Sequence, residues 1–149
     1  FPGMRVLQFG FDSATDTYHR PENYPLNSVA YTGTHDNDTV VGWYQQRQSD
    51  SARTGKRDLL DRYLSADTRE DSIHWQLMAM VFNSASHTAI VPMQDVLGLG
   101  NDARMNLPGK AEGNWQWRLL PRQLEDSLAA KLRVLTEHSR RLQPISLAH

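Results

Sequence analysis

The chain has 149 residues, a length typical of one domain, and its 16 Lys and Arg residues nearly balance 17 Asp and Glu residues. The net charge of −1 gives no electrostatic basis for binding nucleic acid or a membrane surface, and the absence of cysteine excludes a disulfide framework, a thiolate metal site and a cysteine nucleophile. No apolar stretch approaches the ~20 residues needed to span a bilayer, and no signal-peptide pattern opens the chain, so we expect a cytoplasmic protein.

The first residues are unusual for a natural N-terminus. The chain opens on Phe1-Pro2-Gly3 without an initiator methionine, and an apolar run begins at Val6. Natural N-termini are usually polar and poorly ordered. We therefore expect this opening segment to come from the interior of a larger protein.

Three short segments predict β-strands. Each is rich in Val, Ile, Phe or Tyr and is bounded by Gly or Pro, the pattern typical of strands. The segments are Arg5–Phe11, Ser28–Tyr31 and Thr88–Val91.

Two segments predict well-defined helices. The first begins at Asp67–Glu70, which has the form of a capping box, and continues through two apolar stripes as far as Phe82, so we expect burial on more than one side. The second follows Pro121 and carries Leu124, Leu128, Leu132 and Leu135 on one face. Acidic residues in its first turn and arginines in its last turn suit the helix dipole.

Two weaker helices lie between the strands. They are predicted at Asp38–Arg47 and Lys56–Leu64, with the polar segment Gln48–Gly55 between them as a surface loop. The alternation of strands and helices predicts an α/β fold with a parallel sheet. Parallel sheets are normally covered on both faces, and three strands with two good helices are too few for an independent domain of this class.

Polar side chains follow each predicted strand. Asp12 follows the first strand, His35 and Asp36 follow the second, and Gln94 and Asp95 follow the third. Active sites of α/β proteins lie at this end of parallel strands. Aspartate is also a common turn former or helix cap in such loops, so for Asp12 and Asp95 taken singly the structural interpretation is favoured.

The run from His35 to Asp38 holds four consecutive strongly polar residues. Asn37 or Asp38 could serve as the N-cap of the following helix, which would account for one polar residue and leave His35 and Asp36 unexplained. A divalent metal site is a third interpretation, but the run lacks the i, i+4 histidine spacing of helical zinc motifs. We therefore expect no metal and no other cofactor.

A second unusual stretch runs from Met105 to Arg118. It contains two tryptophans, two glycines, two asparagines and a glutamate, a composition that suits sugar binding because pyranose faces pack on aromatic rings. Trp115 and Trp117 could equally be packing anchors for a loop. The other histidines carry no spacing signal, and for His74 and His87 we expect structural roles.

Several blocks of the sequence resemble one enzyme family. The resemblance is to the C-terminal part of the 4-α-glucanotransferases of glycoside hydrolase family 77, and it is carried by Phe1–Phe9, Asn23–Pro25, Val29–Thr39 with Gly42-Trp43, Met105–Gly109 and Glu112–Arg118. The blocks occur in order over nearly the whole chain. This resemblance implies a TIM (β/α)8 barrel, of which residues 1–149 would form about the last three βα units without a separate second domain.

The resemblance also implies site residues. Asp36 matches the third catalytic carboxylate, the transition-state stabiliser, and His35 would bind sugar hydroxyls of the donor. Asn106 matches a region that lines the acceptor side. The predicted substrate-binding set also includes Asn37, Asp12 and Trp115.

The implied activity is retaining transfer of α-1,4-glucan segments between malto-oligosaccharides. The family's nucleophile and acid/base lie upstream of the segment that matches Phe1, so we expect the isolated chain to be inactive. Two alternatives are a non-catalytic module that binds α-glucans through Asp36, His35 and Trp115, and a structural fragment that folds only by self-association. The last follows from the sheet edges and apolar surface that part of a barrel exposes.

Overall fold

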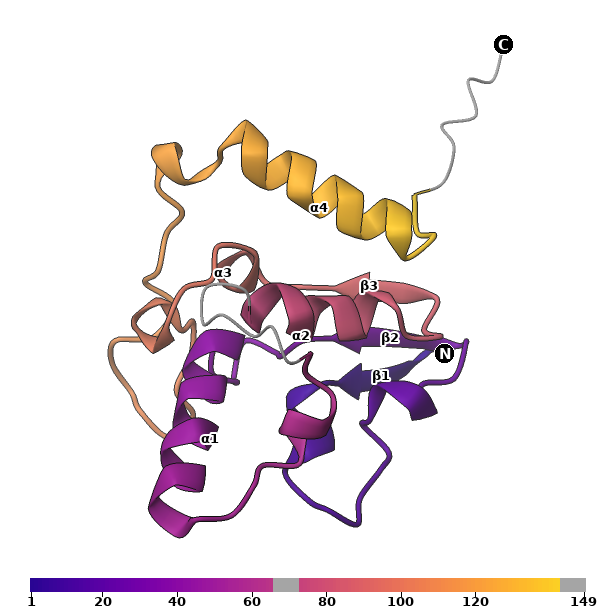
Figure 1. Cartoon of the computed structure of the whole chain (residues 1–149). Coiled ribbons are helices and arrows are strands. Elements are labelled where there is room, and N and C mark those ends of the chain that lie inside the picture. The colour runs from indigo at the N-terminus through magenta and orange to yellow at the C-terminus, as the bar shows by residue number, and fades with distance from the viewer. Residues whose placement is uncertain (66–72, 143–149) are drawn as a thin grey trace.

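A three-stranded parallel sheet forms the centre of the computed structural model, which describes residues 1–65 and 73–142 (Figure 1). Its strands are β1 (Gly3–Val6), β2 (Ser28–Tyr31) and β3 (Thr88–Ile90), in the order β1-β2-β3. The parallel pairing agrees with the predicted α/β class. The bounds predicted for β2 are confirmed, and β3 ends one residue earlier than expected.

The prediction of a strand as far as Phe11 was wrong. β1 ends at Val6, and Gln8–Phe11 form a 3-10 turn. Leu7, Gln8, Gly10 and Phe11 are buried while Phe9 is exposed, so burial here does not follow the alternation of a strand. This turn carries the chain away from the sheet before Asp12.

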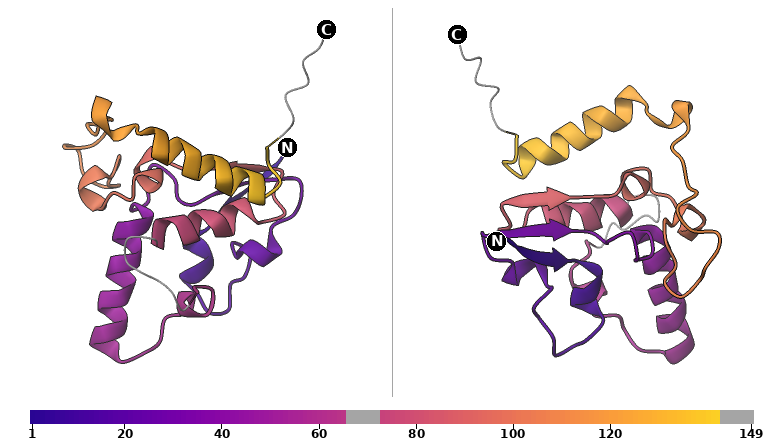
Figure 2. Two further views of the ribbon diagram at one scale, coloured as in Figure 1. Left: turned by 45° about the horizontal axis from the view of Figure 1, so that its top comes forward. Right: turned by 180° about the vertical axis from the view of Figure 1, so that it is seen from behind.

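Helices pack on one face of the sheet. They include α1 (Val40–Thr54) and α2 (Ile73–Phe82), and the core beneath them contains Leu7, Phe11, Tyr24, Ala30, Val40, Trp43, Leu60, Ile73, Leu77 and Val81. The opposite face carries Met4 and Ile90, which are 53% and 46% exposed. Seen from behind, the strands lie in front of α2 (Figure 2), so this second face is open in the part of the chain that the structure describes.

Helix α1 differs from its prediction at both ends. Its N-cap is Thr39, whose Oγ1 accepts a hydrogen bond from the Gly42 N–H at 3.2 Å, so neither Asn37 nor Asp38 has that role. The helix continues to Thr54 and ends at Gly55 with φ of 68°. The predicted surface loop Gln48–Gly55 is therefore the last part of α1 and its cap. This part of the helix faces solvent and has no apolar stripe, so the sequence pattern did not indicate a helix there.

The remaining helices agree in part with the sequence. Only the 3-10 turn Leu60–Arg62 forms within the helix predicted at Lys56–Leu64. Burial of six side chains on α2 confirms that it packs on more than one side, whereas the capping box predicted at Asp67–Glu70 lies outside the described residues. A four-residue helix, α3 (Met93–Val96), follows β3. None of the described helices combines the length and apolarity needed to cross a membrane.

Helix α4 (Asp126–His138) confirms the predicted last helix, although Leu124 and the two arginines lie outside it. It borders α2, where the Lys131 ammonium lies 4.4 Å from the centre of the Trp75 ring. Beyond its end, the Arg141 guanidinium donates hydrogen bonds to the carbonyl oxygens of Phe82, Ser84, Ser86 and His87. Arg140 has a left-handed φ of 57°, which turns the chain so that Arg141 reaches these carbonyls.

Asp95 joins the carboxyl end of the sheet to α1. This residue is 1% exposed, and its carboxylate accepts hydrogen bonds from Thr32 Oγ1 at 2.6 Å and from the Val40 N–H at 2.9 Å. Burial raises the pKa of the Asp95 carboxyl, and the two hydrogen bonds oppose that rise. The structural interpretation of Asp95 therefore agrees with its contacts.

Replacing Asp95 tests this connection. Asp95→Ala leaves the Val40 N–H and the Thr32 hydroxyl without their partner, so the free energy of unfolding should fall by about 3 kcal/mol. Asp95→Asn keeps the shape and should be close to neutral. The pKa of Asp95 is higher in the folded chain than in the unfolded chain, where it is about 3.9. Between these two pKa values the folded state holds the proton more tightly, so the free energy of unfolding of the unsubstituted chain should fall as the pH rises across this range. Urea denaturation across this range checks both effects, and an Asp95→Asn variant with an unchanged slope would contradict the second.

Arg141→Met should lower the free energy of unfolding by about 2 kcal/mol, because four carbonyl oxygens lose a charged donor. Arg140→Gly should raise it by about 1 kcal/mol, since glycine adopts a positive φ without the cost of a Cβ. Urea denaturation measures both. Arg133→Met, which removes only an exposed pair with Glu137, is the matched control, and equal losses for Arg133 and Arg141 would contradict the anchoring role.

Candidate functional site

The His35–Asp36 pair lies just after β2, at the carboxyl end of the sheet, against a second loop that contains Asn106. His35 Nε2 lies 3.3 Å from Asp36 Oδ1, and Asn106 Nδ2 donates a hydrogen bond to the same oxygen at 2.5 Å. The backbone N–H of Asn106 also donates to the His35 carbonyl at 3.1 Å. These contacts hold the Asp36 carboxylate in place. It is still open to a ligand, because the side chains of His35 and Asp36 are 58% and 48% exposed.

Trp115 joins this cluster from further along the chain. Its ring centre lies 5.1 Å from that of His35, with the planes tilted by 39°, and the residue is 50% exposed. Its backbone N–H donates to the Met105 carbonyl at 2.6 Å, and its φ of 62° is unfavourable for a residue with a bulky side chain. Such strain is typical of functional sites, and the exposed ring favours the sugar-binding interpretation over a packing anchor.

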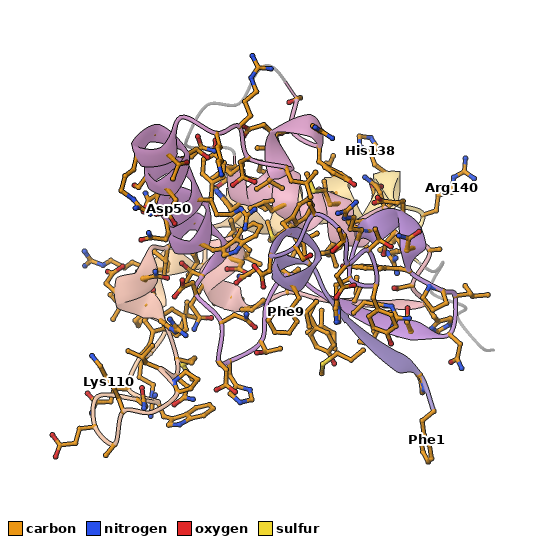
Figure 3. All side chains as sticks on the ribbon, turned by 90° about the horizontal axis from the view of Figure 1, so that it is seen from below. Phe1, Phe9, Asp50, Lys110, His138 and Arg140 are labelled. Carbon is orange, nitrogen blue, oxygen red and sulfur yellow. The ribbon has the colours of Figure 1, made fainter. Side chains whose placement is uncertain are left out.

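Asn114 gives the neighbouring loop, residues 107–114, its shape. Its Oδ1 accepts from the Leu107 N–H at 2.8 Å, and its Nδ2 donates to the Lys110 carbonyl at 2.9 Å. Figure 3 shows Lys110 at the outer end of this loop, away from the body of the protein. The loop is thus closed at its base, directly before Trp115.

Two residues that the sequence did not indicate hold the His35–Asp38 run. Arg104 Nε donates to the Asn106 carbonyl at 2.8 Å, and its guanidinium also binds the Asp36 carbonyl and the Asp38 carboxylate. Gln8 Nε2 donates to the Asp38 carbonyl at 2.8 Å. Gln8 lies within the predicted first strand, where nothing in the sequence indicates a role in the site. For Arg104, the sequence indicates such a role only by its position directly before the Met105 block.

A pocket of about 420 Å³ adjoins the cluster on the open face of the sheet. Apolar and polar side chains both line it, a mixture that suits a sugar ring with its hydroxyls. The lining includes Met4, Tyr31, His35, Asn37, Asp38, Ile90, Gln94 and Met105.

The structure brings together four of the six predicted site residues: Asp36, His35, Asn106 and Trp115. Asn37 lines the pocket, but its Oδ1 accepts from both the N–H and the hydroxyl of Thr34, at 2.8 and 2.7 Å, and so closes the turn. No three His, Asp or Glu side chains in residues 1–65 and 73–142 gather as a metal site would need.

Asp12 lies apart from the cluster. Its side chain is 61% exposed beside α1, with its Oδ1 3.8 Å from Arg47 Nη1. Partial burial raises the pKa of its carboxyl, and the Arg47 charge opposes that rise. The 3-10 turn after β1 explains this position, because it directs the chain toward α1 instead of along the strand to the pocket.

Comparisons with known proteins identify relatives of this chain. Residues 1–124 match the family model described as 4-alpha-glucanotransferase. The 4-alpha-glucanotransferase of Synechocystis sp. is 49% identical, over 92% of this chain and 26% of the relative, and that of Thermus thermophilus is 44% identical, over 95% and 28%. The structure of amylomaltase from Streptococcus agalactiae in complex with acarbose superimposes with a TM-score of 0.78 at 33% identity, covering 96% of this chain and 28% of that one. The chain thus spans about a quarter of the length of these relatives.

Asn114→Ala should open the loop before Trp115, because the Leu107 N–H and the Lys110 carbonyl lose their partners. We expect cleavage by trypsin after Lys110 to become about tenfold faster, the effect of about 1.4 kcal/mol of lost local stability. Limited proteolysis followed by mass spectrometry measures the rate. Gln116→Ala, an exposed change nearby, is the control, and equal cleavage in both variants would show that Asn114 does not close the loop.

Proposed function

The chain belongs to the 4-alpha-glucanotransferase family, glycoside hydrolase family 77, and on this basis we propose that it supplies one wall of the active site of such an enzyme. Residues 1–149 form about the last three βα units of a (β/α)8 barrel. Support comes from the parallel order of the three strands, the helices on one face, and the polar cluster at the carboxyl end of β2. Polar residues at that end of parallel strands are typical of barrel active sites.

Asp36 is the carboxylate that stabilises the transition state, and its placement is the observation that carries the proposal. Its side chain is half exposed, and both His35 and Asn106 contact Oδ1, so its orientation is fixed before substrate arrives. Retaining transfer at a glycosidic carbon passes through a cation-like transition state. A fixed carboxylate that binds the sugar more tightly in that state accelerates the reaction and does more than bind substrate.

The surrounding side chains bind and shield the sugar. His35 hydrogen-bonds donor hydroxyls, and the exposed Trp115 ring packs on the apolar face of a glucose unit. Asn106 lies toward the acceptor sugar. The loop from Leu107 to Trp117 helps to exclude water, so that a sugar 4-hydroxyl replaces water as acceptor.

The nucleophile and the general acid/base come from the part of the family sequence upstream of Phe1. The substrates are malto-oligosaccharides or other α-1,4-glucans, as the family's name implies. The isolated chain therefore transfers no glucan, and Asp36 acts only when the other carboxylates face it across the barrel.

A chimera tests this function. This chain replaces the matching quarter of the Synechocystis enzyme, and transfer is measured as the glucose and maltopentaose formed together when one maltotriose gives its maltosyl unit to another. The chimera should be active, and Asp36→Asn should lower its kcat by roughly a hundredfold or more, the usual effect of losing one group that stabilises transition-state charge.

The exposed change Glu137→Gln is the control and should leave the chimera's rate unchanged. A folded chimera without activity, or full activity in the Asp36→Asn variant, would contradict the proposed function. Robust transfer by the isolated chain would contradict its dependence on upstream carboxylates.

A further inference from the structure

We propose that Arg104 is a positioning residue for Asp36, an inference that rests on the proposed function of Asp36. Arg104 follows the 3-10 turn Asn101–Ala103 and is only 20% exposed in its side chain. Arg104 also borders the pocket, but its three guanidinium nitrogens bind protein acceptors, and the one at Asp36 binds the backbone and not the carboxylate, so it acts on the site through geometry. Through its hydrogen bonds it holds the His35–Asp38 run against the loop that contains Asn106.

One guanidinium makes three attachments. Nε donates to the Asn106 carbonyl at 2.8 Å, one terminal nitrogen donates to the Asp36 carbonyl, and the other pairs with the Asp38 carboxylate. The side chain of Asp38 is 27% exposed, so solvent screens this pair less than it would a surface pair. The guanidinium thus fixes the backbone on both sides of the contact between Asn106 and Asp36.

Further contacts depend on this arrangement. Asn106 can donate its backbone N–H to the His35 carbonyl and its Nδ2 to the Asp36 carboxylate only while the two loops stay aligned. From the opposite side, Gln8 Nε2 holds the Asp38 carbonyl. Asp38 is therefore fixed at its backbone by Gln8 and at its carboxylate by Arg104.

Arginine suits this position for a stereochemical reason. Its planar fork presents N–H donors on three separate nitrogens in fixed directions, whereas lysine carries all of its donors on one nitrogen, which cannot span acceptors as far apart as these. Misplacement of a catalytic group by about 1 Å costs roughly a hundredfold in rate. The fork therefore keeps the Asp36 carboxylate at the place where charge develops on the sugar.

The first experiment uses the active chimera. Arg104→Ala should lower kcat by roughly a hundredfold, while KM for maltotriose changes by less than about threefold. Millimolar guanidinium should restore part of the lost kcat, because it can occupy the site of the missing side chain. Arg104→Lys should remain slow, and Arg133→Ala on α4 is the control arginine.

The kinetic outcomes separate this inference from the proposed function. A chimera that loses activity with Asp36→Asn but keeps it with Arg104→Ala would overturn the inference alone. A loss that guanidinium does not restore, or that appears mainly in KM, would also overturn it, since either result marks a general defect of folding or binding.

The second experiment needs no activity and uses the 149-residue chain. In Arg104→Ala, hydrogen exchange at the Asn106 backbone amide should become at least tenfold faster, because its bond to the His35 carbonyl is no longer enforced. Amides of α2 should keep their protection, which shows that the fold is intact. Unchanged protection at Asn106, or equal loss of protection throughout α2, would overturn the inference, and neither result depends on the chemistry of Asp36.

Discussion

A single buried carboxylate fixes both ends of the segment on which this site is built. Asp95 accepts one hydrogen bond from Thr32, where β2 ends, and another from Val40, where α1 begins. Between these two residues lie His35 and Asp36, so the carboxylate closes the loop that presents them. Burying an aspartate is costly, and the cost is offset only because both of its oxygens are engaged. The fold and the site thus depend on the same group.

The second loop gives the site its detailed geometry. Arg104 and Asn106 come from a segment far along the chain, and they contact the His35–Asp38 run through backbone and side-chain groups alike. Trp115 completes the cluster in a backbone conformation that a bulky residue rarely adopts. The Asn114 contacts across the preceding loop and the bond from the Trp115 N–H to the Met105 carbonyl lie on either side of this strained residue.

The open face of the sheet relates the fold to the function. Parallel sheets are normally covered on both faces, yet Met4 and Ile90 remain about half exposed beside the pocket. The chain spans about a quarter of the length of its relatives, and a face that is apolar at its centre and polar at the strand ends is suited to form one wall of a larger enclosure. Under the proposed function, Asp36 is one of several carboxylates that face a common substrate.

The sequence by itself determined β2, helices α2 and α4, the family and the grouping of polar residues after β2, because short apolar runs and an unusual polar run are local signals. It misjudged the end of β1, and with it the location of Asp12, since a strand and a 3-10 turn share the same apolar residues over so few positions. Only the tertiary structure decided that Gln8 and Arg104 hold the site. Hydrogen bonds between residues 30 or 66 positions apart leave no periodic trace in the sequence, because each partner is compatible with many neighbours until the fold brings the two together.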